Sequence, residues 1–325
     1  MSNTRGDTQT WGIRRAWWIL GVTAAAVLLH ATSSARAVPL RGALAAVPSA
    51  PQPVLRYPAG IALDTRGQIY ITDSIDNRLQ KLSPQGRVIA TWGHKGSGPG
   101  QFDGPSGIAV DAQGKIFVAD TRNHRVQKLS PQGRSLARWS RSTSRLLFEP
   151  GGISLDGHGK LYVADGENAW IEVLSSAGKT LARLGSFENP SNGQFAGPSA
   201  VAVDIHGYVY VADYTWITKL SPGGKPIVTW GKYGHDRNRF QLPSGVAVDL
   251  RGDVYVSDAL ANRIDKLAPD GKLLLRWGTM GHRPGQLDGP TGVATDAQGN
   301  VYVTDFGNHR VDKFSSDGRP LAAWR

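Results

Sequence analysis

The chain contains no cysteine among its 325 residues and only two methionines. The absence of cysteine excludes a disulfide framework, a thiolate metal site, a cysteine nucleophile and a lipid-modified cysteine. Forty glycines and 19 prolines beside so little methionine argue against a helical bundle and favour many short strands with tight turns. With 40% hydrophobic and 19% charged residues the chain can build a sizeable core, which excludes wholesale disorder.

The first 37 residues have the pattern of an export signal. Arg14 and Arg15 precede an apolar stretch, residues 16–29, and an A-x-A-like site follows at residues 35–37. The apolar stretch is shorter than the roughly 20 residues of a membrane-spanning helix, so we expect a signal peptide, with an uncleaved N-terminal anchor as the alternative. The paired arginines leave the twin-arginine route open beside general export. Residues 38–55, rich in alanine and proline, are predicted to be a linker.

The rest of the chain repeats one unit six times. Each unit has P-x-G or a variant, an apolar pair, Asp-x-x-Gly, an apolar strand that ends in Asp, a polar loop and another strand. The first aspartate is at Asp64, Asp111, Asp156, Asp204, Asp249 and Asp296, and the second at Asp73, Asp120, Asp165, Asp213, Asp258 and Asp305. Successive units are 45 to 48 residues apart, and six matches at one period indicate a repeat architecture.

Each unit contains four short segments rich in β-branched and aromatic residues, in the first unit residues 60–64, 69–73, 79–83 and 88–92. Asp-x-x-Gly and Ser-Pro-x-Gly between these segments fit type I turns. Four antiparallel strands cannot bury both faces alone, so the units must pack on one another. We therefore predict an all-β fold, a six-bladed β-propeller of four-stranded antiparallel blades over residues 56–325. A parallel solenoid fits less well, because the period is too long.

Two units, residues 105–134 and 290–319, carry P-x-G-apolar-Ala-apolar-Asp or a close variant, then aromatic-Val-x-Asp, Asn-x-Arg and Lys-apolar-Ser. This pattern resembles the NHL repeat. The resemblance implies the propeller fold but not one function, because NHL propellers include RNA-binding regulators, protein-binding sensors on bacterial surfaces and a peptide-amidating lyase. The chain ends in a fourth strand, so six complete blades can be counted. Residues 42–47 also resemble a fourth strand, but we favour a linker there.

The resemblance also suggests two enzymes with a metal in the central channel, the amidating lyase and the gluconolactonase type of propeller. It implies that the lyase carries zinc-binding histidines beside the glycine that opens several inner strands. The matching positions hold Ala59, Ser106, Gly151, Ser199, Ser244 and Thr291. None of these supplies an imidazole nitrogen, and they form no acidic and amide cluster. We therefore predict no enzyme, no catalytic residue, no metal and no cofactor.

Most recurring polar and aromatic residues are expected to be structural. The twelve aspartates stand at strand ends, where their carboxylates can accept backbone N–H bonds. Four arginines follow the second aspartate by five residues and are expected to pair with it or brace the loop: Arg78, Arg125, Arg263 and Arg310. One slot of the fourth strands is expected to pack blade on blade; it holds Trp92, Trp139, Leu184, Trp230, Trp277 and Trp324.

Two units break the repeat in the arginine slot. The third holds Trp170, and the fourth, whose loop is two residues shorter, holds Trp216 with Tyr214 beside it. In propellers of this kind the loops between strands two and three share a face with the loops that join blades. Aromatic residues on that face suit a carbohydrate, a peptide or another flat ligand. The alternative is that the tryptophans only repack the space left by the shorter loop.

Cations and histidines in the loops that join blades complete the predicted ligand-binding set: Arg141, Arg145, Lys232, Arg237, His235 and His282. The two histidines could titrate together, or they could be ordinary solvated loop residues. Without residues 1–37 the chain carries 33 Lys and Arg against 25 Asp and Glu. We predict that this excess lies in the loops and makes the loop face basic, so that it attracts an acidic protein, an acidic glycan or another anionic ligand.

The predicted function is an exported, non-enzymatic, monomeric propeller, in the periplasm or outside a bacterial cell. It would bind a ligand or a protein, or act as a scaffold, through its basic, tryptophan-bearing loop face. A propeller hydrolase or lyase with a channel metal and an RNA-binding propeller are the alternatives. The export signal argues against nucleic acid as the partner, and we expect contact with a membrane only through an uncleaved N-terminal segment.

Overall fold

The computed structural model describes residues 55–140, 149–185, 195–231 and 239–325, all within the compact unit Pro53–Arg325. The predicted export signal and residues 42–47 lie outside the described residues. No helix in the described ranges has the length and apolar character needed to cross a membrane. Their secondary structure consists of strands and one turn of 3-10 helix, η1 (Thr121–Asn123).

The strands form six four-stranded antiparallel sheets, each built from four consecutive strands, so the predicted fold is confirmed. Blades one to three are β1 (Pro58–Leu63), β2 (Ile69–Asp73), β3 (Arg78–Leu82) and β4 (Val88–Trp92); β5 (Pro105–Val110), β6 (Ile116–Asp120), β7 (Arg125–Leu129) and β8 (Ser135–Ser140); β9 (Pro150–Leu155), β10 (Leu161–Asp165), β11 (Trp170–Leu174) and β12 (Thr180–Leu184). Blades four to six are β13 (Pro198–Val203), β14 (Val209–Asp213), β15 (Trp216–Leu220) and β16 (Pro226–Trp230); β17 (Pro243–Val248), β18 (Val254–Asp258), β19 (Arg263–Leu267) and β20 (Leu273–Trp277); β21 (Pro290–Thr295), β22 (Val301–Asp305), β23 (Arg310–Phe314) and β24 (Pro320–Trp324).

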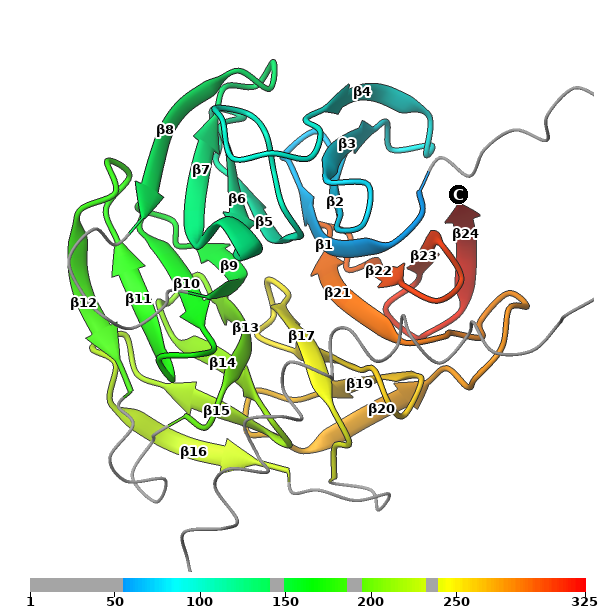
Figure 1. Ribbon diagram of the computed structural model, residues 1–325. Coiled ribbons are helices and arrows are strands. Elements are labelled where there is room, and N and C mark those ends of the chain that lie inside the picture. Colours follow the sequence, from blue (N-terminus) through cyan, green and yellow to red (C-terminus); the bar gives the residue numbers. More distant parts are fainter. Residues whose placement is uncertain (1–54, 141–148, 186–194, 232–238) are drawn as a thin grey trace, which may run out of the picture. The chain divides into compact units, whose positions relative to one another are not determined.

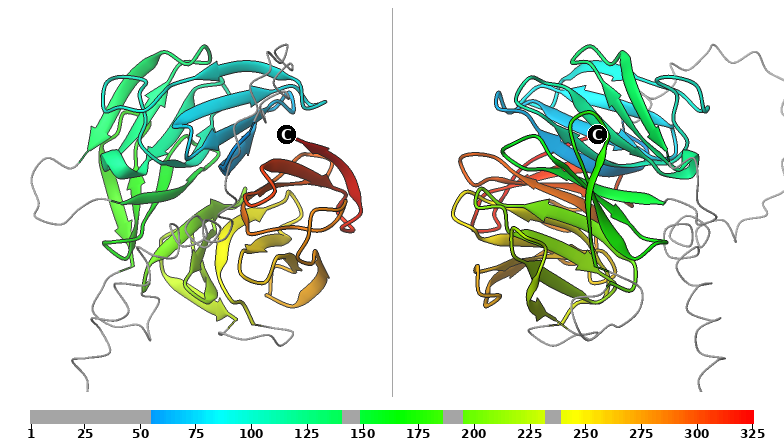
Figure 2. Two further views of the ribbon diagram at one scale, coloured as in Figure 1. Left: turned by 45° about the vertical axis from the view of Figure 1, so that its right-hand side comes forward. Right: turned by 90° about the vertical axis from the view of Figure 1, so that its left-hand side faces the viewer.

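The six blades form a closed ring in which the first strands lie at the centre and the fourth strands at the periphery (Figure 1). Each first strand contacts the first strand of the next blade, and β21 contacts β1. The strands run through the ring from one end to the other (Figure 2). Antiparallel pairing therefore puts the turns that follow first and third strands at one end, the turn face. The loops that follow second and fourth strands lie at the other end, the loop face, as predicted.

The repeated aspartates hold the turns and loops in the predicted way. In the first turn of blade two, the Gly114 N–H donates to the Asp111 carbonyl at 2.8 Å, with Gly114 at φ +78°. The Asp111 carboxylate accepts the N–H groups of Gln113 and Lys115. Equivalent bonds to backbone N–H groups occur at all twelve repeated aspartates. The structural interpretation of these residues is confirmed.

The tryptophan slot of the fourth strands joins each blade to the next. Trp92 lies against Gly133 in the outer turn of blade two, so closely that a Cβ on that glycine would be 2.3 Å from the indole ring. The same contact recurs in every pair of neighbouring blades, and Trp324 meets Gly86 to close the ring. Each of the six core clusters likewise takes its side chains from two adjacent blades. The ring closes with all four strands of blade six consecutive in the chain.

Candidate functional site

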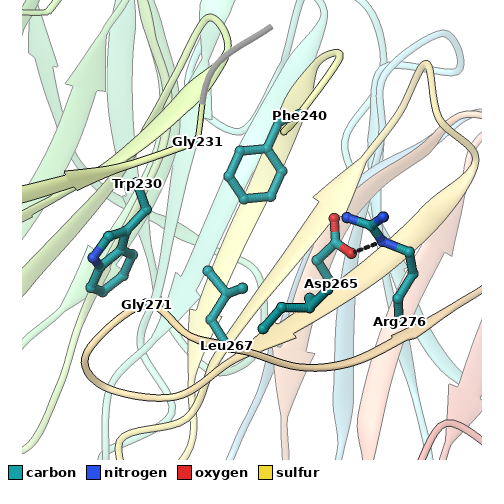
Figure 3. Close-up of a pocket in the computed structure, with 8 residues that line it drawn as sticks. Trp230, Gly231, Phe240, Asp265, Leu267, Gly271 and Arg276 are labelled. Atoms are coloured by element: carbon teal, nitrogen blue, oxygen red, sulfur yellow. Dashed lines mark hydrogen bonds and ion pairs between the residues drawn. The ribbon is translucent and has the colours of Figure 1, made fainter. Parts of the chain in front are cut away.

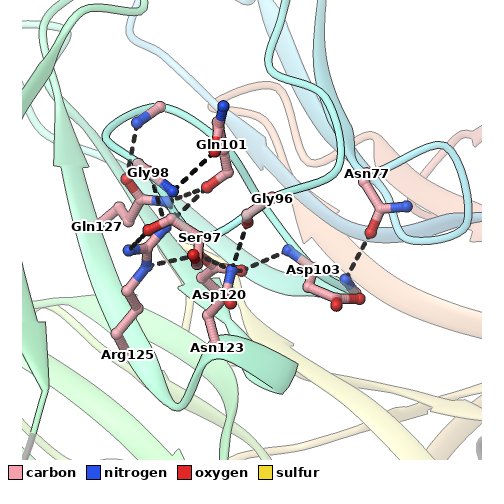
Figure 4. A network of polar contacts seen from close by, with 12 residues as sticks. Asn77, Gly96, Ser97, Gly98, Gln101, Asp103, Asp120, Asn123, Arg125 and Gln127 are labelled. Atoms are coloured by element: carbon pink, nitrogen blue, oxygen red, sulfur yellow. Dashed lines mark hydrogen bonds and ion pairs between the residues drawn. The ribbon is translucent and has the colours of Figure 1, made fainter.

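The loops on the loop face are held by the arginine that follows the second aspartate. In blade two the Arg125 Nε donates to the Asp120 carboxylate at 2.7 Å. Its two terminal nitrogens donate to the carbonyls of Ser97, Gly98 and Gln101 in the loop that joins blades one and two. Figure 4 shows the guanidinium enclosed by this loop. Arg125 thus both pairs with the aspartate and braces the loop, and the two predicted roles are combined in one side chain.

The arginines of blades five and six repeat both contacts, and the arginine of blade one repeats the ion pair. Arg310 pairs with Asp305 and donates to the carbonyls of His282 and Gln286 at 2.7 Å each. Arg263 pairs with Asp258 and reaches the Arg239 carbonyl, and Arg78 pairs with Asp73. These arginines are part of the scaffold that sets the shape of the loop face.

Blade three has Trp170 where the arginine stands elsewhere. Its partly buried ring lies 4.8 Å from the guanidinium carbon of Arg183 on the outer strand. Arg183 also lies 3.7 Å from the carboxylate of Glu172, which is buried. The Asp165 carboxylate is held by the side-chain amide of Asn168 at 2.8 Å. The Trp170 ring therefore contacts a cation of its own blade.

Blade four confirms the alignment that puts Trp216 in the same slot, because Asp213 pairs in register with Trp216 as Asp165 does with Trp170. The Trp216 indole N–H donates to the Asp213 carboxylate at 3.1 Å. Two backbone N–H groups, of Ala196 and Gly197, donate to the same carboxylate at 2.8 Å each. Burial raises the pKa of Asp213 to about 6, although these three bonds favour the charged form.

This arrangement predicts a pH-dependent effect of Trp216→Phe, which removes the N–H donor and keeps an aromatic ring. Because the native pKa of Asp213 lies above its ordinary value near 4, its contribution to stability falls as the pH rises from about 4 to about 6. Losing a hydrogen bond to the charged carboxylate should cost about 2 kcal/mol at pH 8 and about 1 kcal/mol or less at pH 5. Urea unfolding at the two pH values measures the difference.

Trp230→Phe is the matched control, because the Trp230 indole nitrogen has no hydrogen-bond partner among the described residues. Its cost in unfolding free energy should be the same at both pH values. A cost of Trp216→Phe that did not change with pH would contradict the assignment of the indole as a donor to a titrating carboxylate.

The two tryptophans lie in different gaps between blades. Trp170 and Leu174 are on one side of β11, and Leu174 packs against blade two. Trp216 and Leu220 are on the corresponding side of β15, and Leu220 packs against blade three. Blade three therefore stands between the two indole rings, and the structure does not bring them together as a continuous aromatic surface.

The remaining predicted site residues divide into two groups. Arg141, Arg145, Lys232, His235 and Arg237 lie outside the described residues. His282 lies in the loop held by Arg310, with its Nδ1 3.2 Å from the side-chain oxygen of Asn308. Tyr214 is exposed (37%) on the short loop of blade four, with a positive φ of 50°. Tyr214 is the most exposed member of the predicted aromatic group, since Trp170 and Trp216 are both partly buried.

Two exposed aliphatic side chains on the loop face were not among the residues predicted from the sequence. Ile75 and Leu260 stand at equivalent positions of blades one and five and are 41% and 61% exposed. In each loop an asparagine donates to the carbonyl of that aliphatic residue, Asn77 to Ile75 and Asn262 to Leu260. The side-chain oxygens of Asn77 and Asn262 accept the N–H groups of glycines in the next blade, at 2.8 Å in both cases. The exposed side chains of Ile75 and Leu260 therefore project from loops that are hydrogen-bonded to the next blade.

The positions that correspond to the lyase ligands serve as links between blades at the centre of the ring. Ser106 Oγ donates to the Gly151 carbonyl, Ser199 Oγ to the Pro243 carbonyl and Thr291 Oγ1 to the Ala59 carbonyl, at 3.0 to 3.2 Å. These three hydroxyl groups join β5 to β9, β13 to β17 and β21 to β1, whereas the Ser244 hydroxyl donates to the Leu242 carbonyl of its own blade. Within the described ranges, no group of three or more His, Asp or Glu side chains is arranged to hold a metal ion.

A shallow pocket lies between blades four and five (Figure 3). Trp230 and Phe240 line one part of it, and Asp265 and Arg276 form an ion pair in another. Its volume of about 20 Å³ suits a single water molecule. The pocket is too small for a ligand of the predicted kinds.

Four cations of the predicted basic loop face, Arg141, Arg145, Lys232 and Arg237, lie outside the described residues, so the charge can be counted only for the rest of the chain. The described loop-face segments between strands hold four Lys and Arg and five Asp and Glu, and are therefore nearly balanced. The outer rim, which we define as the turns after the third strands with the fourth strands, comprises residues 83–92, 130–140, 175–184, 221–230, 268–277 and 315–324. It holds nine Lys and Arg against two aspartates. In the described part of the chain, the basic surface is the outer rim.

A family model for the NHL repeat matches residues 55–82, 102–129 and 287–314. These segments are the first three strands of blades one, two and six, with the residues just before them. The chain carries NHL repeats. The blades in which tryptophan replaces the arginine, three and four, are among those that the model does not match.

Solved structures show the fold of this NHL propeller in other proteins. Virginiamycin B lyase from Staphylococcus aureus is 13% identical, with a TM-score of 0.57, over 82% of this chain and 84% of that one. A gluconolactonase from Xanthomonas campestris is 16% identical, with a TM-score of 0.58, over 78% and 84%. A chain of a nidogen/laminin complex is 18% identical, with a TM-score of 0.59, over 77% and 90%. No curated protein matches the sequence. At these identities the likeness concerns the fold alone.

Proposed function

We propose that this NHL propeller is an exported, non-enzymatic module that binds a protein partner through its loop face. The observation that carries the proposal is the pair of exposed aliphatic tips, Ile75 and Leu260, held on loops that asparagine side chains tie to the next blade. Apolar anchors on preorganised loops are typical of protein-binding surfaces, because little conformational entropy is lost on docking. Tyr214 adds an exposed aromatic side chain on the same face.

An enzymatic role has less support from the residues in the ring centre. Three of the four hydroxyls at the lyase-ligand positions, those of Ser106, Ser199 and Thr291, donate to carbonyls of the neighbouring blade, and that of Ser244 donates to the Leu242 carbonyl. The two enzymes among the similar structures share the propeller at 13% and 16% identity, which carries no active site with it. The nearly balanced charge of the described loop-face segments also gives an RNA-binding role little basis there.

The proposal predicts that Ile75→Ser/Leu260→Ser abolishes partner binding without unfolding the protein. The matched control is Ile205→Ser/Leu250→Ser, which changes two aliphatic residues on the turn face that are more exposed (67% and 63%) than Ile75 and Leu260. Both variants should melt at the wild-type temperature, because exposed side chains contribute little to the core. In crosslinking followed by quantitative mass spectrometry, the partner's yield should fall at least about tenfold for the loop-face variant only.

Two outcomes would overturn the proposal. One is an unchanged partner yield for the loop-face variant. The other is a hydrolase or lyase activity in purified protein that contains stoichiometric zinc or calcium.

A further inference from the structure

The outer rim of blades one to four carries cations and no carboxylate. We call this part of the rim the basic belt; it comprises residues 83–92, 130–140, 175–184 and 221–230. It holds six Lys and Arg, all exposed, and no Asp or Glu: Arg87, Arg134, Arg138, Lys179, Arg183 and Lys225. Both aspartates of the outer rim, Asp270 and Asp317, belong to blades five and six.

The turns beside the basic belt do not cancel its charge. The first turns of blades one to four, residues 64–68, 111–115, 156–160 and 204–208, hold three Lys and Arg and four Asp. With these turns included, the surface still holds nine cations against four aspartates, and each of these carboxylates accepts two backbone N–H groups of its own turn. The same segments of blades five and six hold four cations against five aspartates. The positive excess is therefore confined to blades one to four.

Five of the six belt cations form no ion pair within the described residues. The exception is Arg183, whose side chain is 41% exposed and lies 3.7 Å from the Glu172 carboxylate. At the same position of β8, Arg138 is opposite Gln127 instead of a carboxylate. In blades five and six, two rim arginines are paired: Arg276 with Asp265 and Arg319 with Asp317. The basic belt thus keeps charges that a ligand can reach.

The fourth strands follow one another head to tail around the circumference of the ring (Figure 1). The end of each lies on the glycine that precedes the next: Trp92 on Gly133, Trp139 on Gly178 and Leu184 on Gly224. Each of these glycines is followed directly by a belt cation. In β8 and β12 an arginine follows four residues further on, after about 13 Å of strand. The cations therefore form a row along an outward-curved line.

We propose that the basic belt binds a linear acidic polysaccharide that follows the fourth strands around the ring. A row of exposed cations is complementary to a chain of carboxylate groups, and arginine forms charge-assisted hydrogen bonds with such groups. A flexible polymer can follow an outward-curved line across several blades, whereas a folded protein or a flat membrane touches such a line at one place. The fourth strands also pair on one side only, so their outer N–H and C=O groups can bond to sugar hydroxyls.

Nucleic acid fits the basic belt less well. Proteins that bind single strands without sequence preference stack the bases on exposed aromatic side chains. The large hydrophobic side chains that the belt exposes are aliphatic: Val88, Ile89, Leu136, Leu181, Ile227 and Val228. Its tryptophans lie against the glycines of the next blade: Trp92, Trp139 and Trp230. A duplex, with a persistence length of about 150 base pairs, is too stiff to follow the ring.

The test is isothermal titration calorimetry with polygalacturonate, a linear polysaccharide in which every sugar carries a carboxylate, and with its neutral methyl ester. The wild type should bind the acid and not the ester. Long chains should bind more tightly than short ones, because a long chain reaches the cations of several blades. Arg134→Gln/Arg138→Gln/Lys179→Gln should melt at the wild-type temperature and bind at least about tenfold more weakly.

The matched control is Arg251→Gln/Lys272→Gln/Arg319→Gln, which removes the same net charge from exposed positions of blades five and six. It should leave the affinity within about twofold, because long-range attraction to net charge is screened at physiological salt. Equal losses in the two triple variants would reduce the binding to net charge and would overturn the proposal.

Two further outcomes would overturn it. One is no binding of polygalacturonate by the wild type, which, together with aggregation of the belt variant, would assign the cations to protection of the strand edges. The other is tighter binding of single-stranded RNA than of polygalacturonate. The proposal is independent of the loop-face partner, so Ile75→Ser/Leu260→Ser should keep full polysaccharide binding.

Discussion

Replacing Arg125 with alanine is expected to lower the free energy of unfolding by about 3–5 kcal/mol, the range found when one partner of a buried ion pair is removed. Arg125 is 6% exposed and Asp120 is fully buried. Without the guanidinium, the carboxylate keeps amide donors such as the Asn123 and Gln127 side chains but loses its cation. Urea unfolding at pH 7 measures the loss.

The same substitution should loosen the loop that joins blades one and two. Three carbonyls of that loop, those of Ser97, Gly98 and Gln101, accept their bonds from Arg125. The Gly96 and Phe102 N–H groups, which are bonded to carbonyls within the same loop, should therefore exchange with deuterium faster than in the wild type. The arginine thus connects the stability of the blade with the shape of the loop face.

Arg122→Ala is the matched control in the same blade. The Arg122 side chain is 55% exposed and lies 3.7 Å from the Asp103 carboxylate, so its loss should cost less than about 1 kcal/mol. Equal costs for the two alanine variants would contradict the role given to Arg125. Slower exchange of the loop amides in Arg125→Ala would contradict it as well.

The fold could be predicted from the sequence because each blade repeats the same local solutions. The aspartate and glycine of every first turn bond to backbone groups within four residues. The aspartate at the end of every second strand accepts an N–H bond from a residue 16 or 17 positions earlier, just before the first strand of its blade. Such bonds depend on a fixed number of residues between donor and acceptor, and this number can be read from the sequence. The tryptophan slot could be assigned for the same reason, since a large side chain at a regular period in an outer strand must pack on the neighbouring blade.

The location of the charge could not be predicted in the same way. We predicted the excess positive charge in the loops that join blades, because the cations of these loops depart from the repeat. The rim cations belong to the repeat itself, as Arg87 after Gly86 and Lys225 after Gly224 show. A regular cation is easily taken for part of the scaffold, and only its exposure in the structure shows that it is available. The signal in the sequence was that all six turn glycines are followed by Lys or Arg.

The two tryptophans illustrate a second limit. Comparison of the six repeats placed both tryptophans at the position of the arginine. It could not show the direction of the two side chains, because that depends on which side of each strand faces which neighbouring blade. The side that faces each blade is known only from packing contacts, such as those of Leu174 with blade two and of Leu220 with blade three. Trp216 also serves as a donor to Asp213, a role that an arginine has in other blades and that an indole can fill with its single N–H.

Replacing Gly133 with alanine should cost about 3 kcal/mol of unfolding free energy, because two separate penalties add. The first is the left-handed backbone, with φ at +78°, which costs an L-residue about 1–2 kcal/mol. The second is the collision with Trp92, whose ring would be 2.3 Å from the new methyl group, and forced repacking of this kind costs about 1–3 kcal/mol. Gly159→Ala isolates the first penalty, since Gly159 has the same φ of +78° and no atom within 4 Å of the added Cβ.

A double-mutant cycle with Trp92→Leu separates the collision from the backbone term. Leucine already occupies this slot in blade three, where the atom closest to a Cβ on Gly224 would be a terminal methyl group of Leu184, at 2.5 Å. Because such a methyl group can turn aside and a rigid indole ring cannot, Gly133→Ala should cost less in the Trp92→Leu background than in the wild type, and close to the cost of Gly159→Ala. Additive effects of the two substitutions would show that the indole does not press on the turn. Trp324 meets Gly86 in the same way across the junction of blades six and one, so the same cycle made with Gly86→Ala and Trp324→Leu tests the contact that closes the ring.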